Sequence, residues 1–300
     1  MEKKYEIILF GATGFTGQLC AKYFKQNYPD LTWAIAGRDK NKLDDINNKF
    51  NLNVDTLVAD GDNLEALRVM AGQAKVILST AGPFARYSDL LVQACVEQGT
   101  HYTDITGENH WVRTLIDKHH ENASLKGVRI VPSCGYDSIP SDIGTFFAVS
   151  QFNKPVKRVE LFQEMQGGAS GGTIETAFSM GKLSKEMRDP FLLNPENSST
   201  EEQRKYSKDM MRIEKIEELD GWSGMFVMAA GNTRVVRRTA ALMEQNQNSY
   251  GANFTFGEYG LHKTKKLARR ASYGLILGFL IIASPLSCLL YTSPSPRDSV

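Results

Sequence analysis

The sequence predicts an α/β protein in which a doubly wound parallel sheet is followed by a second α/β domain. Three observations predict this. Short apolar runs of strand length alternate with helix-like stretches through residues 7–131. The first apolar run ends in a glycine-rich turn that opens a helix. After about Pro140 the alternation stops, and longer, more polar segments follow.

The expected strands are short, and most of them are apolar, as is typical of strands buried on both faces of a parallel sheet. They fall at residues 7–10, 32–36, 57–59, 76–80, 101–104 and 128–131. Helices are expected between them, at residues 17–25, 40–50, 64–71, 88–98 and 111–123. In the stretch 88–98, Leu91 and Cys95 share one face and Gly99 follows the last turn, as in a capped amphipathic helix.

Composition divides the chain into a series of regions. We expect a first domain at residues 1–140, a second α/β domain at 141–265, an apolar segment with a basic flank at 266–291, and a disordered tail at 292–300. The tail is rich in serine and proline and unlike what precedes it, so it is expected to be disordered, and the sequence leaves both a native and a non-native origin open. No apolar stretch of signal-peptide length follows the charged N-terminus, and no secretory signal is expected.

The second domain has weaker patterns. A strand is expected at 156–165, and a helix at 173–183 after the glycine-rich loop 167–172. The polar stretch 194–220 predicts a loop and an exposed helix. Residues 226–230 and 233–242 fit either two strands or one helix, and the sequence leaves both open.

The C-terminal apolar run, residues 273–291, contains almost no polar group. Its length just reaches the roughly 17–25 residues that a helix needs to cross a bilayer, but Pro285 interrupts it. Basic residues precede it: Lys263, Lys265, Lys266, Arg269 and Arg270. A basic flank beside an apolar run favours membrane contact with that flank on the cytosolic side. Spanning, lying on the surface and packing as a core helix all remain open.

Bulk composition excludes some function classes. The chain has 300 residues, of which 42% are hydrophobic and 23% charged, as in ordinary globular proteins. The net charge of +1 gives no broad electrostatic case for nucleic acid. The cysteines, Cys20, Cys95, Cys134 and Cys288, lie far apart without zinc spacing. They are expected to be reduced thiols, and no metal site is expected.

The first strand ends in Gly11–Gly17, with the sequence GATGFTG, a G-x-x-G-x-x-G pattern that opens a helix. Gly11 lets the chain turn, Gly14 leaves room for a pyrophosphate, and Gly17 lets helix and strand pack closely. The first helical N–H groups and the positive end of the helix then face the phosphates. This is a Rossmann dinucleotide site, for which the expected binding residues are Gly11, Thr13, Gly14, Phe15, Thr16 and Gly17.

The end of the second strand discriminates between NAD and NADP. An acidic residue there would bind the ribose 2′-hydroxyl, but this chain has Arg38, with Asp39 one position late. Arg38, with Lys42 as a second cation, suits a 2′-phosphate, so NADP is predicted. Asp60 after the third strand is expected near the adenine. Residues 81–83 (Ala81, Gly82 and Pro83) after the fourth strand are expected to line the nicotinamide ribose.

Together these stretches resemble the saccharopine dehydrogenase-like oxidoreductase family. The matching segments are GATGFTG, AIAGR, STAGPF, GTHYTDITGE, PSCGYDSIPSD and GGASGGT. The resemblance implies an NADP-binding domain, a second α/β domain, and links to the mycobacterial trans-acting enoyl reductases of lipid and glycolipid synthesis. It also implies association with lipid droplets and other membranes. Members of the family are longer, so the second domain is expected to be incomplete.

Candidate catalytic residues lie at the ends of the fifth and sixth strands, where a doubly wound sheet places its site. Tyr102 or Tyr136 is a candidate proton donor, and Asp104 or Asp137 a candidate to orient it. Against these roles, Tyr102 fits a core position, and Asp137 fits the start of the next helix.

Three functional hypotheses follow. The first is an NADP-dependent oxidoreductase that acts on a lipid-like or small carbonyl, imine or enoyl substrate at a membrane or lipid droplet facing the cytosol, and that is able to form a homodimer. The alternative is a non-catalytic membrane scaffold that senses NADP(H) or keeps the domain only as a fold. The third is saccharopine chemistry, for which Arg86, Arg237 and Arg238 would have to form a cationic pocket.

Overall fold

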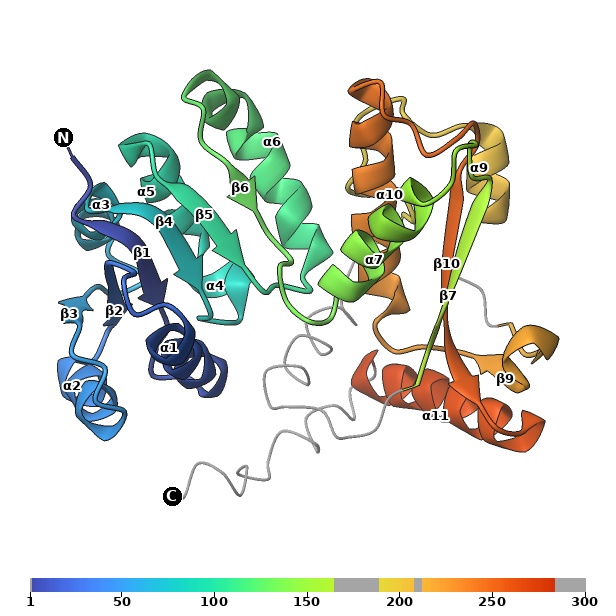
Figure 1. Cartoon of the computed structure of the whole chain (residues 1–300), viewed down its shortest axis with the longest axis horizontal. Coiled ribbons are helices and arrows are strands. Elements are labelled where there is room, and N and C mark those ends of the chain that lie inside the picture. The colour runs from blue at the N-terminus through green and yellow to red at the C-terminus, as the bar shows by residue number, and fades with distance from the viewer. Residues whose placement is uncertain (1, 165–188, 208–211, 284–300) are drawn as a thin grey trace. The chain divides into compact units, whose positions relative to one another are not determined.

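The computed structural model describes residues 2–164, 189–207 and 212–283. The chain divides into two compact units, Met1–Tyr136 and Asp137–Val300. Each unit contains its own sheet (Figure 1).

The first unit is built on a six-stranded parallel sheet with the strand order β3-β2-β1-β4-β5-β6. Its strands are β1 (Tyr5–Phe10), β2 (Trp33–Gly37), β3 (Asp55–Val58), β4 (Ala74–Ser79), β5 (His101–Asp104) and β6 (Ile130–Val131). Its helices are α1 (Phe15–Asn27), α2 (Lys40–Lys49), α3 (Leu64–Gly72), α4 (Phe84–Tyr87), α5 (Asp89–Gln98) and α6 (Asn109–Leu125). This order is that of the Rossmann fold, so the predicted doubly wound sheet is confirmed.

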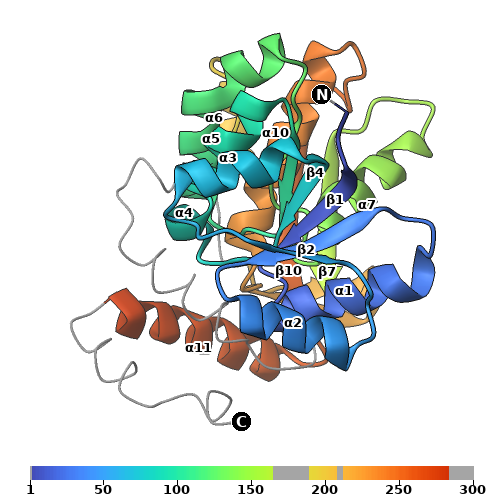
Figure 2. The ribbon, with the colours of Figure 1, turned by 90° about the vertical axis from the view of Figure 1, so that its left-hand side faces the viewer.

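The helices of this unit cover both faces of the sheet (Figure 2). Helices α1 and α2 lie over one face, and α3, α5 and α6 over the other. Both layers bury apolar side chains, such as Leu9, Ile35 and Leu43 on the α1–α2 side. The prediction that Gly99 caps the end of a helix is confirmed, because Gly99 ends α5 in the left-handed conformation with φ of 64°.

Two elements of this unit differ from the predictions. The sixth strand is only Ile130–Val131, because the residues before it pair only partly with β5. The single helix expected at 88–98 is preceded by the short helix α4, which starts directly after Pro83. Proline suits the start of a helix because its missing N–H has no intrahelical partner there.

The second unit contains, in its described part, a four-stranded mixed sheet with the order β7-β10-β9-β8. Its strands are β7 (Arg158–Gln163), β8 (Lys215–Ile216), β9 (Gly221–Gly224) and β10 (Thr255–His262), with a 3-10 turn at Glu217–Leu219. Its helices are α7 (Ile139–Ser150), α9 (Glu201–Tyr206), α10 (Ala229–Gln245) and α11 (Lys265–Ala283). Residues 233–242 are therefore helical, while the helix expected at 173–183 lies outside the described residues.

Helix α7 buries a polar side and exposes apolar residues, which is the reverse of an ordinary surface helix. Its buried side carries Ser141 and Thr145, whereas Ile143 and Phe147 are exposed. On the buried side the Ser141 hydroxyl donates to Oε1 of Glu258 on β10 at 2.8 Å, and the Thr145 hydroxyl donates to the Ser141 carbonyl oxygen at 2.6 Å. This inversion requires a polar partner inside the unit, since buried polar groups must be hydrogen-bonded.

Helix α11 begins in the basic flank and continues into the apolar run. It packs on β9 and β10 through buried positions such as Ala268 and Ser272, and the Ser272 hydroxyl accepts from the Met225 N–H at 2.8 Å. None of the helices described between residues 2 and 283 combines the length and apolar character that a bilayer crossing requires. Residues 284–291 of the predicted segment and the tail at 292–300 lie outside the described residues.

Candidate functional site

The turn between β1 and α1 approaches its neighbours too closely for side chains at two of its three glycines. Gly11 has φ of +84°, and a Cβ there would lie 2.8 Å from the Ala81 nitrogen. A Cβ on Gly17 would lie 2.3 Å from the Gly11 carbonyl oxygen. A Cβ on Gly14 would meet only the Gly11 oxygen, at 3.5 Å, so its outer side is open. The geometry therefore fits a pyrophosphate that approaches the backbone at Gly14.

The start of α1 has the character of an anion site. Its first turn contains no acidic residue, and Gly14 at the N-cap has no side chain to occupy the free amides. Thr13 is held by its carbonyl, which accepts from the Gln18 side chain at 3.1 Å. Thr16 is half-buried, and Phe15 is 71% exposed beside the turn. The unsatisfied amides and the helix dipole together favour phosphate oxygens here.

The end of β2 presents cations. Arg38 and Lys42 are both exposed, one directly after the strand and the other in the first turn of α2. Asp39 is occupied as the N-cap of α2, because its Oδ1 accepts from the Lys42 N–H at 3.1 Å. The acidic neighbour is thus used by the helix, and the role of Arg38 in binding a 2′-phosphate stays a prediction.

The loops after β3 and β4 complete this edge of the sheet. Asp60 is exposed, and its Oδ1 accepts from the Asp62 N–H at 3.1 Å. Residues 80–85, which we call the β4 loop, start at Thr80, whose hydroxyl donates to the carbonyl oxygens of Phe10 at 3.2 Å and Gly11 at 3.1 Å. In this loop Ala81 and Pro83 are half-buried, Gly82 is exposed, and the Gly82–Pro83 bond is cis. The predicted cofactor residues of both loops therefore lie at the carboxyl edge of one sheet.

Two of the predicted catalytic residues, Tyr102 and Asp104, form a buried pair in the first unit. The Tyr102 hydroxyl donates to Asp104 Oδ2 at 2.8 Å, and Oδ1 accepts from the Thr106 and Ser133 amides, each at 3.0 Å. Burial raises the pKa of the Asp104 carboxyl to about 6, and it also raises the pKa of Tyr102. Both carboxyl oxygens are thus engaged in bracing the end of β5, and a catalytic role for the pair stays a prediction.

The other two predicted catalytic residues, Tyr136 and Asp137, are exposed. Tyr136 ends the first unit with 88% of its surface accessible, and Asp137 begins the second unit just before the N-cap of α7. Within the first unit, Tyr136 is the predicted proton donor that remains accessible to a substrate. Its role in chemistry also stays a prediction.

Sequence reasoning missed Glu108, which follows β5 and is 1% exposed. Its carboxylate accepts from the Phe84 N–H at 2.8 Å and the Ala85 N–H at 3.1 Å. These two residues end the β4 loop and form the first turn of α4. No local pattern pointed to Glu108, because the short helix α4 whose amides it binds was not predicted from the sequence.

The chain also contains, at Tyr259 and Lys263, the Tyr-x-x-x-Lys spacing of short-chain dehydrogenases. Tyr259 lies on β10, where its ring stacks on Phe162 at 5.5 Å, and Lys263 follows the end of the strand. Residues four apart on a strand are separated by about 13 Å. The pair therefore does not reproduce the arrangement that a helix would give.

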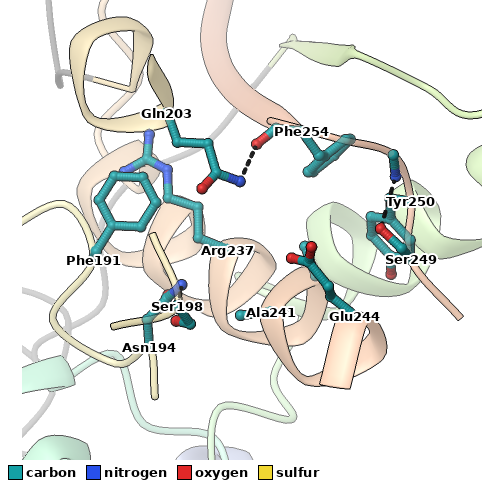
Figure 3. Close-up of a pocket in the computed structure, with 12 residues that line it drawn as sticks. Phe191, Asn194, Ser198, Gln203, Arg237, Ala241, Glu244, Ser249, Tyr250 and Phe254 are labelled. Carbon is teal, nitrogen blue, oxygen red and sulfur yellow. Dashed lines mark hydrogen bonds between the residues drawn. The ribbon is translucent and has the colours of Figure 1, made fainter. Parts of the chain in front are cut away.

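Two arginines expected for a saccharopine pocket have structural partners in the second unit. Arg237 is buried and donates to the carbonyl oxygens of Pro190 at 3.0 Å and Phe256 at 3.2 Å. Its guanidinium also lies 5.3 Å from the centre of the Phe191 ring (Figure 3). Arg238 donates to the Leu193 carbonyl. Both side chains are engaged by backbone carbonyls, so this structure does not favour them as carboxylate-binding groups.

The cavity beside Arg237 is small. It is lined by residues such as Tyr250, Phe254 and Glu244 and has a volume of about 10 Å³ (Figure 3). That volume holds about one water molecule. A cavity of this size is too small for a nucleotide or a lipid-like substrate.

Comparison with known proteins agrees with the first unit's geometry. Residues 7–131 match the family described as the saccharopine dehydrogenase NADP binding domain. A trans-acting enoyl reductase of Mycobacterium ulcerans is 34% identical over 299 residues, covering 92% of this chain and 71% of that protein. A trans-acting enoyl reductase of Mycobacterium leprae is 34% identical over 281 residues, covering 86% of this chain and 65% of that protein. The chain thus spans about two thirds of the length of these relatives.

Among solved structures, a saccharopine dehydrogenase (L-Glu forming) from Saccharomyces cerevisiae aligns with a TM-score of 0.45 and 14% identity, covering 53% of this chain and 34% of that chain. The glycine turn, the cation beyond β2 and the family match define an NADP-binding Rossmann domain of the oxidoreductase class. The chain belongs to the saccharopine dehydrogenase-like oxidoreductase family. The predictions of this family and of NADP as the cofactor are confirmed.

Proposed function

We propose that this protein is an NADPH-dependent reductase of a lipid-like substrate that carries an activated carbon–carbon double bond. Among such substrates we favour an enoyl group. The observation that carries the proposal is the open backbone at Gly14 together with the exposed Arg38 beyond β2. Relatives at 34% identity named trans-acting enoyl reductases support the enoyl substrate.

NADPH, when bound, supplies a hydride, and saturation of a carbon–carbon double bond also takes up one proton. The residues of this chain supply binding and orientation. Amides at the start of α1 bind the pyrophosphate, Arg38 binds the 2′-phosphate, and the β4 loop holds the nicotinamide end. Tyr136 is the exposed candidate for the proton.

The test is turnover by the purified full chain with NADPH and a panel of trans-2-enoyl thioesters of increasing acyl length. We expect loss of NADPH absorbance and formation of the saturated thioester. A Tyr136→Phe variant should slow the reaction without changing NADPH affinity if Tyr136 supplies the proton. Tight NADPH binding with no turnover across the panel would contradict the reductase proposal.

We place the substrate at a membrane or lipid-droplet surface, with α11 as the contact. Tyr273, Leu277 and Leu280 are exposed along one side of this helix. The basic residues that precede and begin α11 include exposed Lys266 and Arg270. Exposed apolar positions beside basic residues suit a helix lying in the interface of an anionic membrane.

Flotation with vesicles tests this placement. Vesicles containing phosphatidylserine should carry the protein more than pure phosphatidylcholine vesicles, and the double substitution Leu277→Glu with Leu280→Glu should abolish the difference. Equal flotation of wild type and variant would contradict membrane contact through α11.

The alternative is a membrane scaffold whose Rossmann domain binds NADP(H) without turnover. The buried Tyr102–Asp104 pair favours it, because two candidate catalytic groups are engaged in structure. Vesicle binding that changes with NADPH in a protein lacking turnover would support the scaffold over the reductase.

A further inference from the structure

The β4 loop is held at both ends. At its start the Thr80 hydroxyl donates to the Gly11 carbonyl in the β1–α1 turn, at 3.1 Å. At its far end Glu108 accepts from the Phe84 and Ala85 amides at 2.8 and 3.1 Å. The residues between these attachments include exposed Gly82. The segment expected to face the nicotinamide is therefore short and fixed on both sides.

Glu108 supplies hydrogen-bond acceptors to the first two amides of α4. Helix α4 begins directly after Pro83, which makes no side-chain capping hydrogen bond. The first amides of a helix need acceptors, and Glu108 supplies one oxygen to each of two amides from 24 and 23 positions further along the chain. The ring of Phe84 also stacks on Trp111 of α6, with 6.2 Å between ring centres. Backbone and side chain of Phe84 are thus both fixed by the segment that follows β5.

Glu108 is itself held in place. Its own N–H donates to the Thr106 hydroxyl at 3.0 Å, and the Thr106 N–H donates to Asp104 Oδ1 at 3.0 Å. Asp104 also accepts from the Ser133 amide, so the network reaches the segment after β6. Because each link is buried, it is protected from competing water.

We propose that Glu108 is a positioning residue for the nicotinamide half of NADP(H), acting through the β4 loop. The inference rests on the proposed function, in which this loop holds the nicotinamide end. A carboxylate is required because two N–H donors face its two oxygens. Glu108→Gln keeps the volume but turns one acceptor into a donor, which opposes an amide and frees that end of the loop.

The experiment compares two ligands by calorimetric titration of the full chain: NADPH, and 2′,5′-ADP, which lacks the nicotinamide half. Glu108→Gln should weaken NADPH about tenfold and change 2′,5′-ADP affinity by less than about twofold. Glu121→Gln is the matched control, because Glu121 is exposed on α6, the helix that begins directly after Glu108. This variant should change the affinity for neither ligand. Retained 2′,5′-ADP binding also reports that the unit is folded.

If Glu108→Gln does not fold, Trp111→Phe reduces the ring contact with Phe84 and leaves the carboxylate in place, so the same selective loss is expected in weaker form. Equal losses for both ligands, or no loss for either, would overturn the inference. Equal wild-type affinity for NADPH and 2′,5′-ADP would instead overturn the proposed contact between the β4 loop and the nicotinamide, and with it the inference.

Discussion

Two glycines of the β1–α1 turn, Gly14 and Gly17, serve different physical purposes. Gly17 is required by packing, because a Cβ would approach the Gly11 oxygen to 2.3 Å. Gly14 has no such neighbour within 3.4 Å, and its φ of −73° is accessible to any residue. Its lack of a side chain is therefore explained by the ligand rather than by the fold.

This difference predicts opposite behaviour for two substitutions. Gly17→Ala should lower the free energy of unfolding of the ligand-free protein by about 1–3 kcal/mol through overpacking. Gly14→Ala should cost less than about 1 kcal/mol of that stability but weaken NADPH binding at least about tenfold. Thermal unfolding without ligand, followed by NADPH titration, measures both. A Gly14→Ala protein that binds NADPH like wild type would show that the pyrophosphate lies elsewhere.

The Asp104 carboxyl predicts a pH dependence. Its pKa is raised from 3.8 to about 6 by burial, so the folded state binds a proton that the unfolded state has released between these values. Its contribution to stability is complete below about pH 4 and is lost as pH rises through about 6. Asp104→Asn removes this loss, since an amide oxygen still accepts from Thr106 and Ser133.

The difference in unfolding free energy between the variant and wild type should therefore shift by about 2 kcal/mol in favour of Asp104→Asn between about pH 4.5 and about pH 7.5. Comparing the two proteins cancels the opposite contributions of His110 and His119, whose pKa values are lowered by burial. A difference that does not vary with pH would exclude Asp104 as the titrating group.

At the scale of elements, one oxygen joins three parts of the second unit. Glu258 Oε1 on β10 accepts from Ser141 of α7 at 2.8 Å, Gln163 of β7 at 3.1 Å and Asn232 of α10 at 3.2 Å. Oε2 is buried and has no hydrogen-bond partner within the described ranges. Burial raises the pKa of this carboxyl. Helices α7 and α10 need a hydrogen-bond acceptor at this point, and these hydrogen bonds do not require a negative charge on Glu258.

We therefore expect Glu258→Gln to keep the unfolding free energy within about 1 kcal/mol of wild type at neutral pH, or to raise it, because the amide keeps the shared oxygen. Glu258→Leu should lower it by about 2–4 kcal/mol, because three donors, two of them buried, lose their acceptor. Urea unfolding of the two variants decides the point. Similar destabilisation by both would show that the charge itself is needed.

These elements show where sequence patterns succeed and fail. Most strands of the first sheet are predictable because a strand covered on both faces is largely apolar, as in β2 and, apart from Glu6, in β1. Strand β10 cannot be predicted in this way, because its buried positions include Glu258 and its interior contains Gly257 and Gly260. Helix α7 carries apolar residues outward, so its pattern does not reveal which side is buried.

At the scale of the whole molecule, some residues of the candidate site can be predicted from the sequence and others cannot. The turn Gly11–Gly17 and Arg38 are local signals, because strand, turn and helix adjoin in sequence. The brace by Glu108 depends on bringing β4 and β5 side by side, which no local pattern states. The sequence left Tyr102 open between a core position and a catalytic one, and its burial depends on the layers that cover β5.

The function proposed for this protein depends on NADP(H) binding through Arg38, and titration calorimetry measures that binding most directly. NADPH should bind the wild type at least about tenfold more tightly than NADH, and Arg38→Ala should lose that preference by weakening NADPH alone. Arg129→Ala, an exposed substitution just before β6 at the opposite edge of the same sheet, should keep it. Equal affinities for NADPH and NADH in the folded wild type, unchanged by Arg38→Ala, would contradict the account.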